Sequence, residues 1–154
     1  MKKIILVASV VIIGSCLAIF FLIRYDNKRA SQMIGNSSVV IDGETILVER
    51  AATPAAQARG LSGRTAMCQD CGMLFTFDSN GVYPFWMKEM NFDLDMLWIT
   101  DGKIVQIDKD VPHTGGTAVT RTPNVPVDDV LELNAGASDR LGFRIGDTVA
   151  FDFK

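Results

Sequence analysis

Two Asp-Gly dipeptides, each between runs of β-branched and apolar residues, constrain the fold of this chain more than any other feature. They are Asp42-Gly43 and Asp101-Gly102. Both central positions of a type I′ turn take a positive φ, which Asp and Gly tolerate, so Asp-Gly between two such runs indicates a β-hairpin. The sequence therefore predicts two antiparallel hairpins, formed by residues 39–41 with 45–49 and by residues 94–100 with 103–110.

Further β-rich segments add strands to these hairpins. Residues 72–77 are nearly all apolar, as in a buried strand. Residues 82–87 are predicted to pair with them across a turn at residues 78–81, with Pro84 at an edge or a bulge. Two more strands are expected, at residues 130–134 and 147–153.

Two short helices interrupt the predicted strands. Thr53-Pro54 supplies the N-cap and first-turn residues of a helix that Gly60 ends, and residues 137–142 are typical of a helical turn closed by glycine. Residues 112–126, which hold three prolines and a Gly-Gly pair, are predicted to form a long loop. Seven or more short strands with two small helices indicate an all-β domain, either a sandwich or a partly open barrel.

The N-terminal segment has a different character. Residues 4–23 contain no charged side chain, and about 20 apolar residues allow a helix to cross a bilayer core. A cleavable signal peptide would have a shorter apolar region of about 7–15 residues. We therefore expect a single transmembrane helix, with residues 1–24 as a membrane anchor, residues 25–38 as a linker and residues 39–154 as the β domain.

Two forms of membrane attachment are compatible with this segment. Two lysines before the apolar run are typical of a signal anchor that leaves the C-terminal domain outside the cytoplasm, although three basic residues also follow the run. Alternatively, Ile13-Gly14-Ser15-Cys16 resembles the lipobox of a bacterial lipoprotein, in which Cys16 is acylated. Either form predicts a domain tethered to the cell membrane through this segment.

Charge and length exclude several classes of protein. The formal net charge is −3, but the first 29 residues hold five basic side chains against one acidic side chain, so residues 30–154 carry −7. An acidic domain binds a phosphate backbone poorly, and we therefore expect no nucleic-acid partner. The length of 154 residues suffices for one domain with a hydrophobic core. We find no cofactor motif and no full set of metal ligands, and expect neither group.

Several short blocks of residues distinguish this β domain from an arbitrary one. They include Gly72-Met73-Leu74-Phe75, Phe85-Trp86-Met87-Lys88, Leu94-Asp95-Met96 and Leu131-Glu132-Leu133. Together the blocks closely resemble the family called domain of unknown function 192, over about residues 39–153. The resemblance implies a mainly β domain, often with an N-terminal export or anchor segment, whose biochemical role is not established.

The chain departs from the common pattern of that family at three places. Members commonly have Asn after the Lys of the Phe-Trp-Met-Lys block, where this chain has Glu89. They commonly have Pro before the Leu-Asp pair, where this chain has Asp93. They also usually lack the paired cysteines. The resemblance therefore does not carry a typical family surface over to this protein.

Cys68-Gln69-Asp70-Cys71 has the spacing shared by redox motifs, half zinc sites and local disulfides. A zinc site needs two further ligands, and His113 is the only histidine. A redox motif usually opens a helix, whereas this one precedes a predicted strand. We favour a small disulfide between Cys68 and Cys71 that fixes the shape of the loop, with thiol-disulfide catalysis as the alternative.

A second group of candidate site residues lies in and after the Phe-Trp-Met-Lys block. Its members are Trp86, Lys88, Glu89, Asp93 and Asp95. Residues two apart on a strand share a face, so Asp93 and Asp95 are expected to project together, with Lys88 near them. Paired carboxylates suit a hard cation or acid-base chemistry, and the structural alternative is an ion pair on a solvated edge.

Arg59 and Arg64 bracket a glycine-containing turn. The two arginines are candidates to hold an anionic group of a ligand. A salt bridge to Asp70 is the expected structural role, because that carboxylate lies close in sequence. Arg59 and Arg64 are thus candidate binding residues in addition to Trp86, Lys88, Glu89, Asp93 and Asp95.

These residues predict a binding protein rather than an enzyme. The sequence has no Ser-His-Asp set and no glycine-rich loop between a strand and a helix. We expect a membrane-tethered, extracytoplasmic β domain that binds a small molecule or a protein through Trp86, Lys88 and Asp95. The alternative is an enzyme, either a thiol-disulfide protein through Cys68 and Cys71 or a carboxylate-dependent hydrolase.

Overall fold

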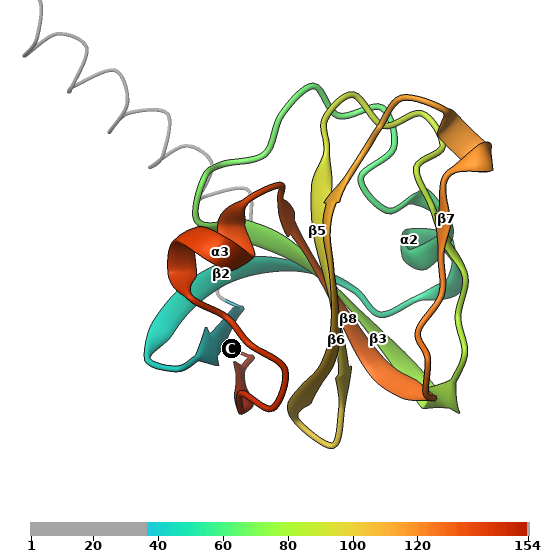
Figure 1. Cartoon of the computed structure of the whole chain (residues 1–154). Coiled ribbons are helices and arrows are strands. Elements are labelled where there is room, and N and C mark those ends of the chain that lie inside the picture. Colours follow the sequence, from blue (N-terminus) through green and yellow to red (C-terminus); the bar gives the residue numbers. More distant parts are fainter. Residues whose placement is uncertain (1–36, 154) are drawn as a thin grey trace, which may run out of the picture. The chain divides into compact units, whose positions relative to one another are not determined.

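The computed structural model describes residues 37–153, which form a mainly β domain with two short α-helices (Figure 1). Within this range one seven-stranded sheet is accompanied by a two-stranded sheet. In chain order the elements are β1 (Ser38–Ile41), β2 (Glu44–Ala51), α2 (Pro54–Arg59), β3 (Cys71–Gly81), β4 (Phe85–Trp86), β5 (Leu94–Thr100), β6 (Lys103–Val111), the 3-10 helix η1 (Gly116–Ala118), β7 (Thr120–Arg121), β8 (Val127–Asn134), α3 (Ala137–Leu141) and β9 (Val149–Asp152).

Both predicted hairpins are present. β1 pairs with β2 across Asp42-Gly43, and β5 pairs with β6 across Asp101-Gly102. Asp42 and Asp101 have φ values of 49° and 50°, and the glycines that follow them have 85° and 66°. Because a type I′ turn requires two successive positive φ values, the interpretation of the Asp-Gly dipeptides is confirmed at both places.

Both predicted helices are present as well. The hydroxyl of Thr53 accepts a hydrogen bond from the backbone N–H of Ala56 at 3.2 Å, as an N-cap does, and α2 ends at Gly60, which has a φ of 51°. The second helix, α3, ends at Gly142 with a φ of 77°. Positive φ values at both C-caps explain why glycine occupies them.

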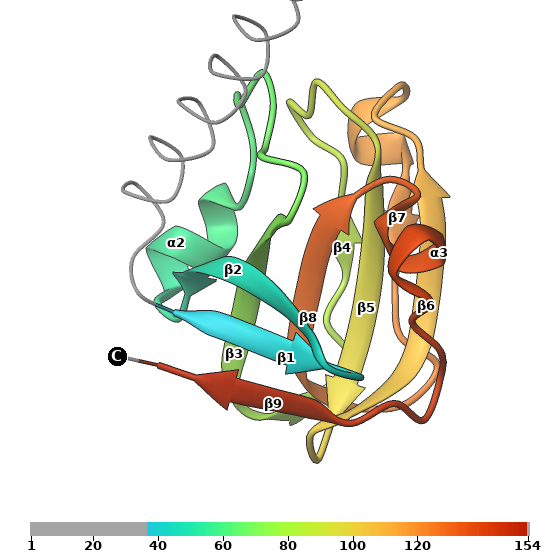
Figure 2. The ribbon, with the colours of Figure 1, turned by 90° about the vertical axis from the view of Figure 1, so that its left-hand side faces the viewer.

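The large sheet curls until its two edges meet. Its strand order is β6-β5-β8-β3-β2-β1-β9. Lys103 at the start of β6 forms a bridge with Thr148, and the N–H of Val149 donates to the carbonyl of Gly102 at 2.8 Å. Figure 2 shows β1 and β9 running crosswise to β5. The result is a curled half-barrel, which fits the predicted partly open barrel better than the predicted sandwich.

The predicted pairing of residues 82–87 with residues 72–77 is wrong. β3 pairs with β2, in parallel, and with β8, antiparallel. The expected turn at residues 78–81 is instead an irregular continuation of β3. β4 pairs with β7, a short strand that lies within the predicted long loop of residues 112–126. Local sequence patterns favoured pairing β3 with the next β-rich segment along the chain. β3 instead buries more surface by lying between two long strands, β2 and β8, than it would by pairing with that short segment.

The sheet buries a hydrophobic core on each of its faces. One core fills the interior of the curl and includes Leu131 and Leu133 of β8. The other lies on the opposite face, where β8 contributes Val130, beneath the segments that contain α2 and β4. Because side chains alternate along a strand, Glu132 of β8 points to the second face, among apolar side chains. This second face holds the candidate site.

The predicted membrane anchor at residues 4–23, the acylation candidate Cys16 and nearly all of the predicted linker lie outside the described residues. None of the helices in residues 37–153 has the length and apolar character that a membrane span requires.

Candidate functional site

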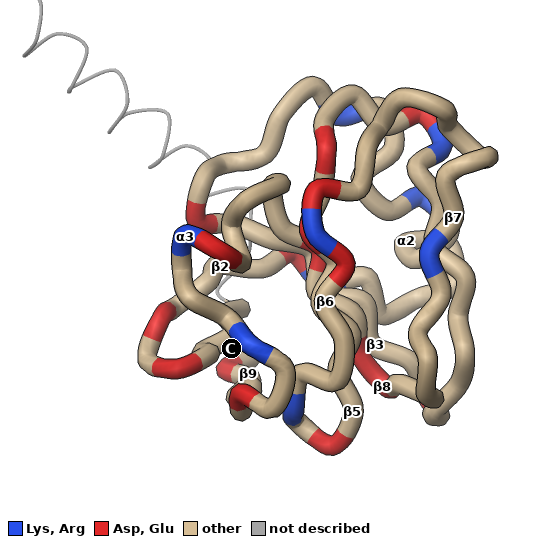
Figure 3. Tube along the Cα trace, in the orientation of Figure 1, with Lys and Arg blue, Asp and Glu red and all other residues tan. Residues whose placement is uncertain are grey.

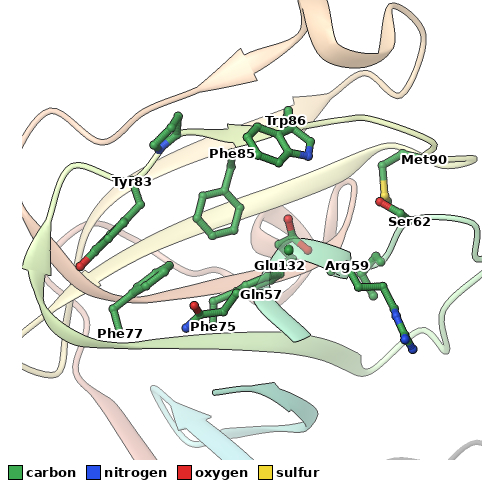
Figure 4. A pocket seen from close by; sticks show the side chains of 14 residues that line it. Gln57, Arg59, Ser62, Phe75, Phe77, Tyr83, Phe85, Trp86, Met90 and Glu132 are labelled. Carbon is green, nitrogen blue, oxygen red and sulfur yellow. The ribbon is translucent and has the colours of Figure 1, made fainter. Parts of the chain in front are cut away.

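A cavity of about 270 Å³ opens between the segment around α2 and the segment around β4. Its floor is formed by β3 and β8, and aromatic side chains make up much of its wall (Figure 4). Phe75 and Phe77 come from β3, whereas Phe85 and Trp86 form β4. The complete lining is Gln57, Ala58, Arg59, Gly60, Leu61, Ser62, Phe75, Phe77, Tyr83, Pro84, Phe85, Trp86, Met90 and Glu132.

The aromatic wall is held in a fixed arrangement. The ring of Phe85 meets those of Phe75 and Trp98 edge-on, with centroids 4.8 Å and 5.3 Å away. Phe77 stacks on Tyr83 at 3.7 Å, and the hydroxyl of Tyr83 donates to the carbonyl of Ser79 at 2.6 Å. Edge-to-face and stacked contacts restrict ring orientation, so the cavity is preformed rather than assembled by a ligand.

Hydrogen bonds tie the two sides of the cavity together. The hydroxyl of Ser62 donates to the carbonyl of Lys88, and the N–H of Gly63 donates to the carbonyl of Glu89, both at 2.9 Å. On the side of α2, a Cβ at Gly60 would lie 3.4 Å from the ring of Phe75. The ring of Phe75 therefore lies close to the backbone at the end of α2.

Glu132 is the one acidic side chain in the cavity lining. It is 5% exposed, and its neighbours in register on β3 and β5 are Met73 and Met96. No group in residues 37–153 forms a hydrogen bond or an ion pair with its carboxyl. Burial raises the pKa of Glu132 from the ordinary 4.5 to about 8, because an apolar environment disfavours the charged form. An unpartnered carboxyl thus faces an aromatic cavity.

Two of the residues predicted for the site lie at this cavity. Trp86 is 49% exposed, whereas the adjacent Met87 is 1% exposed, so this pair is divided between surface and core. Arg59 also lines the cavity and has an exposed side chain. Figure 4 shows the guanidinium of Arg59 extending away from the carboxyl of Glu132. The structure therefore places two predicted site residues, Trp86 and Arg59, in one cavity with Glu132, which was not among the predicted site residues.

Arg64 does not take the partner expected for it. Its guanidinium lies 2.7 Å from the carboxylate of Glu49, while Asp70 pairs instead with Arg140 at 3.1 Å. Arg64 and Arg59 together line a second, smaller cavity of about 200 Å³. The predicted salt bridge between Arg64 and Asp70 is therefore wrong, because Arg64 pairs with Glu49 instead. Glu49 lies on β2, which is farther from Arg64 in sequence than Asp70 is, but close to it in space.

The expected convergence of Lys88, Asp93 and Asp95 does not occur. Asp95 is fully buried, and its carboxylate accepts hydrogen bonds from the N–H groups of Asp110, Gly136 and Ser138 at 2.9, 3.2 and 2.9 Å. It also accepts from the hydroxyl of Ser138 at 2.5 Å. Asp95 thus fastens the turn before α3 and the end of β6 to β5, which is a structural role.

Asp93 lies outside β5, and therefore does not share its alternation. Its carboxylate accepts from the N–H of His113 at 2.8 Å and lies 2.6 Å from the ring Nδ1 of the same residue. These hydrogen bonds, the backbone one first, lower the pKa of Asp93. Lys88 lies 3.8 Å from Glu89, and both side chains are largely exposed. Lys88 and Glu89 therefore form a surface pair of little energetic weight.

The departure from the family pattern at Glu89 has a backbone consequence. Glu89 has a φ of 57°, in the left-handed region. Asn, the residue that the resemblance leads one to expect there, adopts this conformation more readily than Glu. The Asn of the common pattern thus fits the conformation of this turn, and the carboxylate of Glu89 adds charge at the surface rather than in the cavity.

Cys68 and Cys71 form a disulfide with their Cα atoms 5.3 Å apart. The carbonyl of Cys68 accepts a hydrogen bond from the side chain of Asn134 at 2.9 Å, which ties the disulfide loop to the end of β8. Neither cysteine lines the aromatic cavity. The predicted local disulfide is therefore present, and it shapes the loop that leads into β3.

Glu132 was missed as a candidate although the sequence carries a signal for it. A single acidic residue interrupts an otherwise apolar run from Val130 to Leu133. In a strand paired on both sides and covered on both faces, every position of such a run is buried, and a charged side chain is then unusual. The strand was predicted, but nothing in the local pattern indicated that it would be central.

Over the described residues, acidic and basic positions are interspersed, as along β6 (Figure 3). The view shows no continuous band of Lys and Arg.

Comparisons with known proteins agree with this architecture. A crystal structure of a proposed transcription regulator from Sinorhizobium meliloti is 36% identical, with a TM-score of 0.67, over 75% of this chain and 91% of that one. A protein of unknown function from Novosphingobium aromaticivorans is 30% identical, with a TM-score of 0.68, over 73% and 83%. No curated protein matches. The model of DUF192, described as an uncharacterized ACR, matches residues 37–151. The chain therefore belongs to the DUF192 family.

Proposed function

We propose that this domain is a binding module for a small ligand and that the aromatic cavity between α2 and β4 is its site. The observation that carries the proposal is the carboxyl of Glu132, which is buried without a partner and faces a preformed aromatic cavity. Pockets of this kind, mostly apolar with a few polar groups, are typical of small-molecule sites. The half-exposed Trp86 at the cavity supplies a surface for contact with the ligand.

The energetic cost of Glu132 supports a binding role. A buried carboxyl without hydrogen bonds destabilises a fold, whereas an apolar side chain at the same position on β8 would extend the core. Departures from good packing and hydrogen bonding concentrate at functional sites. A bound molecule that supplies the missing partner accounts for a carboxyl at this position.

Replacing Trp86 with Ala tests this proposal. We expect the affinity of the isolated domain for 2-phenylethanol, a neutral aromatic probe, to fall by about thirtyfold, because a tryptophan at the centre of a contact surface contributes about 2 kcal/mol or more. The free energy of unfolding should change by less than about 1 kcal/mol, since the residue is half exposed and lies at the surface of the cavity. NMR titration and urea denaturation measure the two quantities.

Ile145→Ala is the matched control, because Ile145 is 66% exposed and lies outside the cavity lining. It should leave probe affinity unchanged. A large loss of stability in Trp86→Ala would assign Trp86 to the core. Absence of probe-induced shifts at the cavity in the unmodified domain would refute the proposed site.

We propose that the domain is tethered to the cell membrane through residues 4–23 and lies outside the cytoplasm, with acylation of Cys16 as the alternative form of attachment. The uncharged run of residues 4–23 supports tethering. The disulfide between Cys68 and Cys71 supports an oxidising compartment, since structural disulfides are rare where thiols are kept reduced. The acidic charge of residues 30–154 argues against nucleic acid as the partner.

Maleimide tagging of the full chain, expressed in a bacterium, tests this placement. In denatured extract prepared without reductant, we expect no tag on Cys68 and Cys71, and two additional tags after reduction. A single tag before reduction marks Cys16 as a free thiol, whereas none marks it as modified. Reaction of all three cysteines before reduction would contradict an oxidising location.

The enzymatic alternatives have less support. A thiol-disulfide role needs a thiol activated by its surroundings, typically at a helix N-terminus, and the disulfide instead leads directly into β3. A hydrolase at Asp93 and Asp95 needs available carboxylates, but that of Asp95 is fully buried and saturated with hydrogen bonds.

A further inference from the structure

We propose that the ligand of the aromatic cavity carries an organic ammonium group, with the carboxylate of Glu132 as its ion-pair partner and the aromatic rings as its surroundings. This inference rests on the proposed binding function and names the chemical class of the ligand. It follows from the polar groups that the cavity leaves available, from the absence of a competing cation beside Glu132, and from the aromatic character of the wall.

Most polar side chains of the lining are already engaged. The amide of Gln57 donates to the carbonyl of Thr76 at 2.7 Å, and the hydroxyl of Tyr83 donates to Ser79 at 2.6 Å. The hydroxyl of Ser62 donates to Lys88. The carboxyl of Glu132 has no such partner among residues 37–153. It is therefore a buried ionisable group of the cavity that a ligand can engage.

No described cation neutralises Glu132. On β3 and β5 its neighbours in register are the apolar Met73 and Met96. The segment before β4 supplies the titratable Tyr83, whose hydroxyl is engaged elsewhere. α2 supplies Arg59, and its guanidinium extends away from the carboxyl in Figure 4. Burial is the cause that shifts the pKa of Glu132. A positive ligand group would thus complete the site, and an anionic group there would be repelled.

The aromatic wall favours a cation over a neutral hydrogen-bond acceptor. The faces of Trp and Phe rings carry negative electrostatic potential and attract ammonium groups, most strongly where water is excluded. Phe85 and Trp86 come from β4, opposite the floor that holds Glu132 (Figure 4). A cation between these rings and Glu132 can form an ion pair with the carboxylate and cation–π contacts with the rings. A neutral acceptor would gain only one hydrogen bond, from the protonated acid.

Binding of such a cation is coupled to proton release. Because the pKa of Glu132 in the empty cavity is about 8, the carboxyl is mostly protonated at pH 7. An ion pair requires the carboxylate, so the ligand lowers this pKa and expels close to one proton. Affinity for the cation should therefore rise between pH 6 and pH 8 and level off above the pKa of the empty site.

The test compares three probes of similar shape on the isolated domain by calorimetry at pH 7: 2-phenylethylammonium, neutral 2-phenylethanol and anionic 3-phenylpropionate. We expect the ammonium to bind about tenfold to a hundredfold more tightly than the alcohol, the range for a hydrogen bond to a charged group. Glu132→Gln should abolish this preference, and Glu44→Gln, at an exposed hairpin position, should retain it. Buffers of different ionisation enthalpy measure the released proton.

The outcomes separate this inference from the proposed function. Equal binding of alcohol and ammonium, preference for the anion, or a preference for ammonium that survives Glu132→Gln would overturn the ammonium assignment and leave a binding cavity in place. Ammonium binding without proton release would also overturn the assigned ion pair. Failure of all three probes to bind at the cavity would refute the binding function itself, and the ammonium assignment with it.

Discussion

Replacing Glu132 with Gln is expected to raise the free energy of unfolding by about 3 kcal/mol at pH 7 and to leave it nearly unchanged below pH 4. Gln has the same shape and is neutral at every pH. The two proteins therefore differ in the ionisation of one carboxyl, which burial disfavours in the folded state.

The sign follows from the two states of the chain. Below pH 4 Glu132 is protonated in both the folded and the unfolded chain, so its ionisation costs the fold nothing. As the pH rises above 4.5, the unfolded chain releases the proton while the folded chain holds it up to a pKa of about 8. The unfolded state thus gains stability over this interval, and the folded protein loses it.

Urea denaturation between pH 4 and pH 8 measures this difference, with Glu44→Gln as the exposed control. The gain in Glu132→Gln should grow with pH, while the control follows the unmodified protein. A gain that is the same at every pH would show that packing, not ionisation, causes it. A loss at pH 7 would show that the ionised carboxyl has a stabilising partner.

The second large effect is expected at Asp95. Replacing Asp95 with Ala should lower the free energy of unfolding by about 3–5 kcal/mol, the cost of removing a buried charged group from its hydrogen-bond network. The change leaves three backbone N–H groups and the hydroxyl of Ser138 without their acceptor inside the protein. Thermal or urea unfolding of the purified domain measures the loss.

Two matched variants show whether the loss comes from this network. Ser138→Ala removes one of the donors and should cost about 1 kcal/mol. Asp93→Ala removes a carboxylate that is two residues away but 43% exposed, so we expect a loss of about 1 kcal/mol or less. If Asp95→Ala costs no more than Asp93→Ala, the four hydrogen bonds do not stabilise the fold as argued.

Local sequence was sufficient where structure depends on a few consecutive residues. The hairpins at Asp42-Gly43 and Asp101-Gly102 follow from the φ values that their turns require. The two helix ends follow from Gly60 and Gly142. The disulfide between Cys68 and Cys71 follows from a spacing that brings the cysteines within reach. None of these depends on which distant strand lies alongside.

Local sequence was insufficient where the outcome depends on distant neighbours. β4 pairs with β7 and not with β3, because β2 and β8 take both sides of β3. The expected pairing of Asp93 with Asp95 fails because each carboxylate has its own distant partners, His113 for Asp93 and residues at the end of β6 and the start of α3 for Asp95. Arg64 finds Glu49 on β2 rather than the nearby Asp70. In each case a residue far along the chain supplies the partner.

The sequence by itself determined the mainly β class, the two Asp-Gly turns, the local disulfide and the aromatic block that contains Trp86. Only the tertiary structure decided which acidic residue matters at the site. Asp95 and Glu132 both lie in apolar strands and are both buried. Asp95 meets four hydrogen-bond donors, from the end of β6 and the start of α3, whereas Glu132 meets methionines and an aromatic cavity. The difference arises from packing between distant segments, which no local pattern encodes.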